Sequence, residues 1–334
     1  MDPAQIIHAL THTLNHVKEQ RVAAEAFLES AVAQPGFASG LLRIAATHEL
    51  PHIRLAAAVQ LKNSIRKHWV HIVDEDGAPP AGGNKPALST DDKIFVKENI
   101  FEAAVGATTK SGRATLAEAI SQISSFDFPG DWQSLLPQIQ TALQGGDLTR
   151  TTHTLQVVRL LLKHFEFRSR ERREPIEWLV NHLFPSIEPI FMQVVQVAGG
   201  GDPAQIEAAG NVARLIVKCV FSGSMFCMPE YFKHQANVLR WMKLMNDVAA
   251  LDVEPFLVGM DDEDKNAYAW VKAKKWTMRY FHRLFSRFGN FKFCAKEDHA
   301  FCAIFNEHLS KTLMQTTMGI IALRVSGKFC SDRC

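Results

Sequence analysis

Two charged segments that follow each other in the chain are the strongest candidates for a binding surface. The first is acidic, because residues 261–264 read Asp-Asp-Glu-Asp with no basic residue among them. The second is basic, because residues 266–292 carry Lys and Arg and no carboxylate. Part of it repeats every four residues, the spacing that places side chains on one face of an α-helix. The four members of this basic stripe are Lys275, Arg279, Arg283 and Arg287.

These segments point to binding chemistry. The acidic loop, formed by Asp261, Asp262, Glu263 and Asp264, predicts contact with a basic cargo or another basic protein surface; a solvated loop is the alternative. The basic stripe can pair with these acids or with an acidic partner. Aromatic residues beside it, such as Trp276 and Phe285, also fit a nucleic-acid site. Their helical spacing favours core packing instead, and a formal net charge of +2 argues against a dedicated nucleic-acid binder.

Patterns typical of catalysis or metal binding are missing from the sequence. It contains no GxSxG, no GxxxxGK[ST], no HExxH, and no GxGxxG between a strand and a helix. His8 and His12 have the i, i+4 spacing that can bind zinc on a helix, but no carboxylate or cysteine stands near enough to complete a site. We therefore predict no catalytic residue, no metal site and no cofactor.

Almost every segment of the chain has the periodicity of an amphipathic helix. Leu155, Val158, Leu162 and Phe165, for example, are spaced by three, four and three residues. Alternating strand patterns and hairpin turns are missing. Helices of this length cannot bury an apolar stripe alone, so they must pack on neighbours. Pairs recurring about every 40 residues predict an all-α fold, an α-solenoid of HEAT-type antiparallel helix pairs in a right-handed superhelix.

Local signals predict where individual helices begin and end. Pro3 occupies the tolerated first position of the first helix, and Asn15 is the expected cap of the second. Ser89 begins a fifth helix, and the last helix covers about 297–318. Trp69 closes the apolar stripe of a helix that starts at Pro51, so we expect its side chain to be buried.

Composition divides the chain into four parts. Residues 1–72 hold the first helix pairs, and residues 73–90, rich in Gly, Pro and Ala, predict a flexible loop. Residues 91–320 hold further repeats, and residues 321–334 predict an irregular tail. No apolar run approaches the roughly 18 residues of a membrane span, and the start lacks signal-peptide features. We therefore expect no membrane association and a cytosolic or nuclear location.

Several motifs resemble one known family. Leu61-Lys62-Asn63 followed by Trp69, together with Arg54–Ala58, resembles the N-terminal domain of the importin-β superfamily, the karyopherins. Asp127-Phe128-Pro129 followed by Trp132 is similar to a turn found after the third repeat of these receptors. The acidic loop, followed by Trp270, resembles the importin-seven and importin-eight branch. The similarity covers about residues 1–290, the N-terminal portion of a longer receptor, and residues 1–72 correspond to the importin-β N-terminal domain.

The resemblance implies a nuclear import receptor that performs no catalysis. It implies binding of Ran-GTP, of phenylalanine–glycine (FG) nucleoporins and of protein cargo, including basic cargo, with Ran-GTP releasing the cargo. The implied Ran contacts lie on one helix at Lys62, Asn63, Arg66 and Lys67. Such a receptor shuttles between nucleus and cytoplasm through the nuclear pore. The alternatives are a HEAT-repeat scaffold without Ran dependence and an exportin-like receptor that binds Ran-GTP and cargo together.

Overall fold

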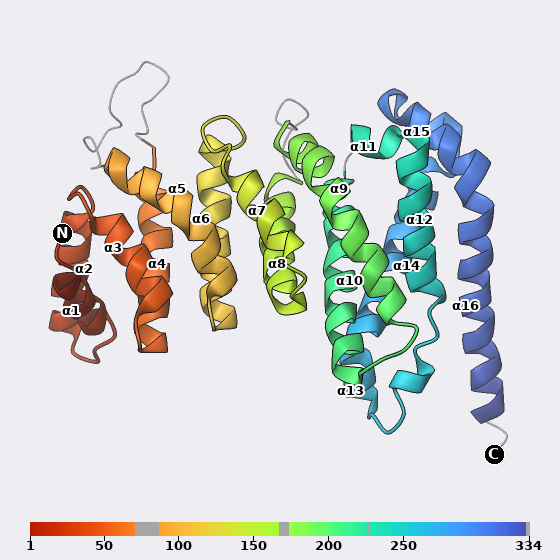
Figure 1. The fold of residues 1–334 in the computed structure, drawn as a ribbon, viewed down its shortest axis with the longest axis horizontal. Coiled ribbons are helices and arrows are strands. Elements are labelled where there is room, and N and C mark those ends of the chain that lie inside the picture. The colour runs from red at the N-terminus through yellow and green to blue at the C-terminus, as the bar shows by residue number, and fades with distance from the viewer. Residues whose placement is uncertain (71–86, 167–173, 226, 332–334) are drawn as a thin grey trace. The chain divides into compact units, whose positions relative to one another are not determined.

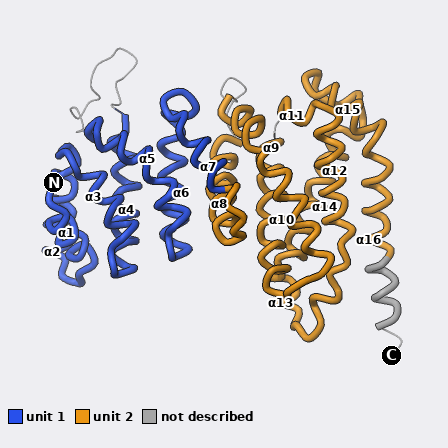
Figure 2. The backbone as a smooth tube through the Cα atoms, viewed as in Figure 1, with its two compact units in different colours: residues 1–142 blue, residues 143–334 orange. Residues whose placement is uncertain are grey.

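The computed structural model describes residues 1–70, 87–166, 174–225 and 227–331, with side chains described to residue 322. Helices dominate these residues, and none of them lies in a β-strand, so the predicted all-α class is confirmed. The chain divides into two compact units, Met1–Ala142 and Leu143–Cys334 (Figure 2).

Unit 1 is built from successive helix pairs (Figure 1). Helix α1 packs on α2, α3 on α4, and α5 on α6, while α1–α3–α5 and α4–α6 also contact each other in order. The helices α1 to α7 are Pro3–Thr13, Lys18–Ala31, Phe37–Thr47, Pro51–His68, Thr90–Gly106, Lys110–Asp127 and Leu135–Gln144. Two layers of helices therefore enclose a continuous apolar core.

Two buried tryptophans tie three helices of unit 1 together. Trp69, only 2% exposed as predicted, donates its indole N–H to Oδ1 of Asp127 at 3.2 Å. Lys97 of α5 donates to Oδ2 of the same carboxylate at 3.0 Å. Trp132 in turn donates to the backbone carbonyl of Lys97 at 3.1 Å. The Asp-Phe-Pro turn found in the sequence therefore joins the C-terminal ends of α4 and α6 to the middle of α5.

A buried carboxylate joins two neighbouring pairs in the same unit. Asp92 of α5 is 3% exposed and accepts hydrogen bonds from the backbone N–H groups of Gly36 and Ser39, both at 3.0 Å. These are donors that the first turn of α3 cannot satisfy internally. Ser89 caps α5 as predicted, accepting from Asp92 N.

The helices of unit 2 pack in two layers (Figure 1). Helix α10 contacts both α8 and α14, while α9 packs on α10, and α12 packs on α14 and α16. The helices α8 to α12 are Leu148–Phe165, Glu174–Val197, Pro203–Gly223, Glu230–Lys233 and Gln235–Ala250. The helices α13 to α16 are Asp262–Ala267, Ala269–Phe288, His299–Ile304 and Ser310–Ser331, with a π-turn at Phe305–Leu309.

Two local predictions need correction. Asn15 does not cap α2: its side chain accepts from Val17 N, one residue before the helix starts, and Val17 occupies the cap position without a side-chain bond. The irregular tail at 321–334 is wrong as far as Ser331, because α16 extends there and no proline interrupts its backbone hydrogen bonds. The full length of α16 was not predicted, because its sequence has no continuous apolar stripe.

The predicted boundary at 73–90 does not separate the compact units. Residues 73–86 of that loop lie outside the described residues. The described part reaches the core, since Leu88 is buried and its N–H donates to the carbonyl of His68 at 3.1 Å. Helix pairs on either side of the loop pack on each other, α3 on α5 and α4 on α6. The boundary between the two compact units lies after residue 142, later in the chain than the predicted boundary.

One close helix contact in unit 2 depends on a glycine. The side chain of Trp270 on α14 is fully buried, and its indole N–H donates to the carbonyl of Ile206 on α10 at 2.7 Å. A Cβ at Gly210 would lie 2.7–3.0 Å from atoms of this indole ring. A side chain at residue 210 would therefore force the two helices apart.

We predict that Gly210→Ala destabilises the protein by about 1–3 kcal/mol, because it overpacks this contact. Gly319→Ala is the matched control, since a Cβ there meets nothing within 4 Å. In a helix interior that change should stabilise by roughly 0.5–1 kcal/mol. Chemical denaturation measures both, and two effects of the same sign would contradict the close approach.

Candidate partner-binding surfaces

The predicted Ran-contact residues lie on α4 but face different neighbours. Lys62 forms an ion pair with Glu118 of α6 at 3.1 Å, and its side chain is 22% exposed. Lys67 pairs with Glu29 of α2 at 3.4 Å. Arg66 is exposed, and Asn63, the fourth predicted contact, is half-buried. The surface around α4 therefore alternates basic and acidic groups, and it presents Lys62 and Arg66 beside a carboxylate.

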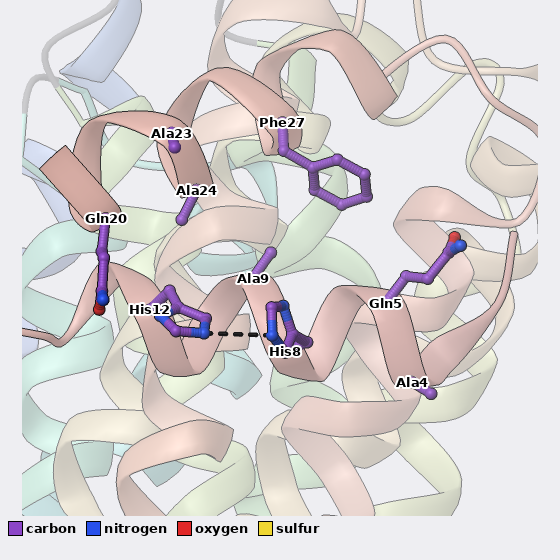
Figure 3. A pocket seen from close by; sticks show the side chains of 9 residues that line it. All are labelled: Ala4, Gln5, His8, Ala9, His12, Gln20, Ala23, Ala24 and Phe27. Carbon is purple, nitrogen blue, oxygen red and sulfur yellow. Dashed lines mark hydrogen bonds between the residues drawn. The ribbon is translucent and has the colours of Figure 1, made fainter.

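An apolar groove of about 600 Å³ lies between α1 and α2 (Figure 3). Its floor is made of small side chains from both helices, and Phe27, 36% exposed, stands at its edge. His8 and His12 line one side, with their Nε2 atoms 3.1 Å apart. The described parts of the chain contain no cluster of three or more His, Cys, Asp or Glu placed to hold a metal ion. The residues lining the groove are Ala4, Gln5, His8, Ala9, His12, Gln20, Ala23, Ala24 and Phe27.

The acidic loop opens a short exposed helix. Asp261 is the N-cap of α13, and its Oδ1 accepts from Asp264 N at 2.8 Å. All four acids are exposed, and Asp262 lies 3.9 Å from Lys265, the next basic residue in the chain. Among the described residues, no ion pair joins this loop to the basic stripe on α14. The carboxylates therefore remain available to a partner.

The basic stripe does not form one exposed surface. Its first two members, Lys275 and Arg279, are exposed, whereas Arg283 and Arg287 are partly covered by the end of α10. Arg283 donates to the carbonyl of Phe221 at 2.7 Å and lies 3.7 Å above that phenyl ring. Burial lowers the pKa of Arg283 to about 10.

Arg287 completes this arrangement at the end of the helix. It donates to the carbonyl of Met225 at 2.7 Å and to Oδ2 of Asp298, which is fully buried, at 3.0 Å. The last carbonyls of a helix have no partner within the helix, so Arg283 satisfies one that α10 leaves open, while Arg287 binds the segment that follows α10. The four-residue spacing was predicted correctly. Two of the four side chains, however, bind the end of α10 and the segment after it, so they have a structural role.

A second cationic group, absent from the sequence predictions except for Arg279, lies on the layer of α8, α10 and α14. Its centre is Lys218 of α10, whose pKa is lowered to about 8 by burial and then by the nearby positive charges of the other four members. The five members of this cationic cluster are Arg159 on α8, Arg214 and Lys218 on α10, and Lys272 and Arg279 on α14.

The cluster lacks compensating anions. In the described parts of the chain, none of its members forms an ion pair with a carboxylate. The Nε atoms of Arg159 and Arg214 are buried without a hydrogen-bond partner among the residues that the structure describes. Burial, followed by the charge of Arg159, also lowers the pKa of Arg214. Lys218 and Arg279 instead lie over the ring of Trp276, at 4.7 and 5.0 Å from its centroid.

Sequence reasoning missed this cluster because its members come from three helices far apart in the chain. One local signal was available: Arg214 and Lys218 are four residues apart in a helix whose other residues are largely apolar. Two charges on one face of a buried helix mark a surface position. That signal does not reveal which other helices supply the remaining charges.

The fold defines an all-α protein built from stacked helix pairs. Within the described residues, no helix is both long and apolar enough to cross a membrane. Residues 24–105 match the family model described as the importin-beta N-terminal domain. The predicted resemblance to the importin-β superfamily is therefore confirmed as a similarity: residues 24–105 match this domain, and the chain is similar to the N-terminal part of longer proteins.

Individual relatives support this placement. Human importin-8 is 26% identical over 325 residues, which cover 96% of this chain and 30% of importin-8. Zebrafish exportin-2 is 26% identical over 260 residues, covering 77% of this chain and 25% of that protein. The structure of the exportin Cse1 in its cargo-free, cytoplasmic state matches with a TM-score of 0.74 at 20% identity, covering 96% of this chain and 32% of Cse1, which shows the shared fold. The chain spans about 30% of the length of the importin-8 relative.

We predict that neutralising the acidic loop leaves stability unchanged while Arg287→Gln lowers it. The loop variant is Asp261→Asn, Asp262→Asn, Glu263→Gln and Asp264→Asn, and asparagine still caps α13. Arg287→Gln leaves the buried carboxylate of Asp298 without its charged partner and should cost about 1–3 kcal/mol. Denaturant melts of both variants test this, and a marked loss in the loop variant would mean that the acids serve an internal contact.

We also predict that Lys218→Met stabilises the protein at neutral pH. Methionine keeps the apolar stem and removes a charge that the folded state disfavours. Because the folded pKa is about 8, below the ordinary lysine value of 10.5, the penalty is complete below pH 8 and disappears as the pH approaches 10.5. The stability gain over the wild type should therefore be larger at pH 7 than at pH 9.5.

Denaturant melts at these two pH values measure the difference. Lys292→Met, at an exposed lysine, is the matched control and should give no such pH-dependent gain. A variant that is less stable than the wild type at pH 7 would contradict the repulsion inferred for the cluster.

Proposed function

We propose that this chain is the N-terminal part of a nuclear transport receptor of the import type, which acts by binding and not by catalysis. The observation that carries the proposal is the importin-beta N-terminal domain at residues 24–105, continued by further helix pairs. In this proposal the receptor binds cargo in the cytoplasm and shuttles through the pore. Nuclear Ran-GTP then binds the receptor and lowers its affinity for cargo, a coupling free energy between two sites.

The proposed Ran contact is the exposed side of α4. Lys62 and Arg66 are four residues apart and so share a face of the helix. The ion pair between Lys62 and Glu118 holds the ammonium group in place, and both side chains remain partly accessible. Exposed pairs of this kind contribute little to stability, so they can rearrange when a charged partner arrives. Asn63 and Lys67 lie on the edges of the same surface.

The groove between α1 and α2 is the proposed contact for FG nucleoporins. Its alanine-rich floor leaves space beside Phe27, and an aromatic ring inserted there would remove apolar surface from water. A wide, shallow apolar site suits weak and rapidly exchanging contacts. The acidic loop is the proposed contact for basic cargo, because its four exposed carboxylates are concentrated in one turn.

An exportin-type receptor is the second candidate. The similarity to exportin-2 over 77% of this chain supports this second candidate. In that mechanism Ran-GTP and cargo bind together, so the coupling free energy has the opposite sign. Measuring cargo affinity with and without Ran-GTP separates the two directions, because linkage requires each ligand to change the affinity of the other equally.

We predict that the chain binds Ran loaded with GTP in preference to Ran loaded with GDP, and that Lys62→Glu or Arg66→Glu weakens this binding at least tenfold. Titration by biolayer interferometry measures the affinity. The double variant Lys62→Glu with Glu118→Lys reverses the charges but keeps the internal ion pair. It should fold normally and still bind Ran weakly.

Lys292→Glu is the matched charge-reversal control in unit 2 and should bind Ran like the wild type. Equal affinity for the two nucleotide states, or no binding at all, would contradict the transport proposal and favour a scaffold without Ran dependence. Full recovery in the double variant would show that the single change acted through stability and not through the contact.

A further inference from the structure

The cationic cluster of unit 2 is a candidate binding surface that is independent of the proposed Ran contact on α4. Its five members lie on α8, α10 and α14, and α10 packs directly on the other two helices (Figure 1). Packed helices lie about 8–10 Å apart, so the cluster spans roughly 20 Å across three helices. Along α10, Arg214 and Lys218 are separated by one helical turn.

The arrangement is unfavourable for the chain in isolation. Partial burial and mutual repulsion lower the pKa of Lys218 to about 8, and buried Nε–H donors on Arg159 and Arg214 face no acceptor in the described protein. Buried polar groups are normally hydrogen-bonded, and buried charges are normally paired. An anion placed over the cluster would pair with its accessible cationic groups and reduce the repulsion among them.

Unpaired charge is a property of the cluster and not of every partly buried arginine on α14, as the two neighbouring arginines show. Arg283 and Arg287 are also partly buried, but carbonyl oxygens of the α10 terminus and the carboxylate of Asp298 accept their N–H groups. These two arginines are satisfied within the protein. In the cluster, Arg214 donates one Nη–H group to Oδ1 of Asn211 at 3.2 Å, but among the described residues no carboxylate pairs with any member and the Nε atoms of Arg159 and Arg214 have no acceptor.

We propose that α8, α10 and α14 form a docking site for an acidic peptide segment, an extended stretch of a partner protein rich in Asp and Glu. An extended chain of about six residues covers 20 Å, the span of the cluster. Alternate carboxylates of such a segment reach Arg159 and Arg214, whose planar guanidinium groups donate bidentate hydrogen bonds to carboxylates. Lys218, Lys272 and Arg279 supply the remaining charges.

The aromatic residues at the site favour a peptide over single-stranded nucleic acid. Sequence-independent binding of a single strand uses open aromatic faces on which bases stack. Here Trp276 already lies beneath Lys218 and Arg279 and contacts Phe221 edge-on, with centroids 5.4 Å apart. The ring of Phe221 is covered by Arg283. The formal charge of +2 likewise provides no extended basic field for a duplex.

Fluorescence anisotropy with the whole chain and a labelled decaglutamate peptide tests the proposal. The variant Lys272→Gln with Arg279→Gln removes two accessible cations of the cluster. Lys292→Gln with Lys296→Gln removes the same charge from exposed sites elsewhere in unit 2. At 50 mM salt we expect the cluster variant to bind at least tenfold more weakly than the wild type, and the control variant to change less than twofold.

A second readout follows Lys218 itself by NMR of protein with isotope-labelled lysine, assigned with Lys218→Gln. Saturating peptide should raise the pKa of Lys218, because an anion then compensates its charge. Three results would overturn the proposal: equal loss of affinity in the two double variants, an unchanged Lys218 pKa at saturation, or tighter binding of a ten-residue oligothymidylate than of the peptide. The last result would assign the site to single-stranded nucleic acid.

Discussion

The structure depends on one recurring interaction, a buried indole whose N–H group is satisfied by an acceptor on another segment. Helices this short cannot bury their apolar stripes alone, so each joint between pairs needs a large side chain that reaches its neighbour. Trp69 donates to Asp127, and Trp132 to the carbonyl of Lys97. In unit 2, Trp270 donates to the carbonyl of Ile206, and Trp241 to the hydroxyl of Tyr231. Each bond lets an aromatic ring fill a joint without leaving a buried donor unpaired.

Much of this fold could be predicted from the sequence, because the apolar period of each helix reflects burial directly. Burial of Trp69 and the start of α5 at Ser89 followed from stripe and cap patterns. Long-range caps could not be predicted in this way. Asp92 reaches the first turn of α3 from 53 positions beyond Ser39, and nothing in the local sequence marks it as more than a first-turn acid. The length of α16 also escaped prediction, since a helix without a stripe gives no periodic signal.

The candidate surfaces were less predictable for a related reason. Helical spacing shows which side chains share a face, but the tertiary fold decides what covers that face. On α14 the four-residue period was correct, yet the terminus of α10 covers Arg283 and Arg287 and leaves Lys275 and Arg279 exposed. The cationic cluster could be found only once the helix packing was known, because packing brings Arg159 next to residues that are distant in the sequence. A surface formed by three helices has no linear motif.

The candidate surfaces of the two units differ in how their charges are balanced. Around α4, Lys62 and Lys67 each have a carboxylate within 4 Å, so a partner there must compete with an existing ion pair. Such a surface favours selectivity, since only a ligand with complementary charges regains what it displaces. In the cluster of α8, α10 and α14 no anion from the described residues forms an ion pair, so an acidic ligand gains the attraction without displacing one and relieves repulsion as well. A repeat fold suits both arrangements, because each helix pair can contribute one or two charges without altering the core that holds its neighbours.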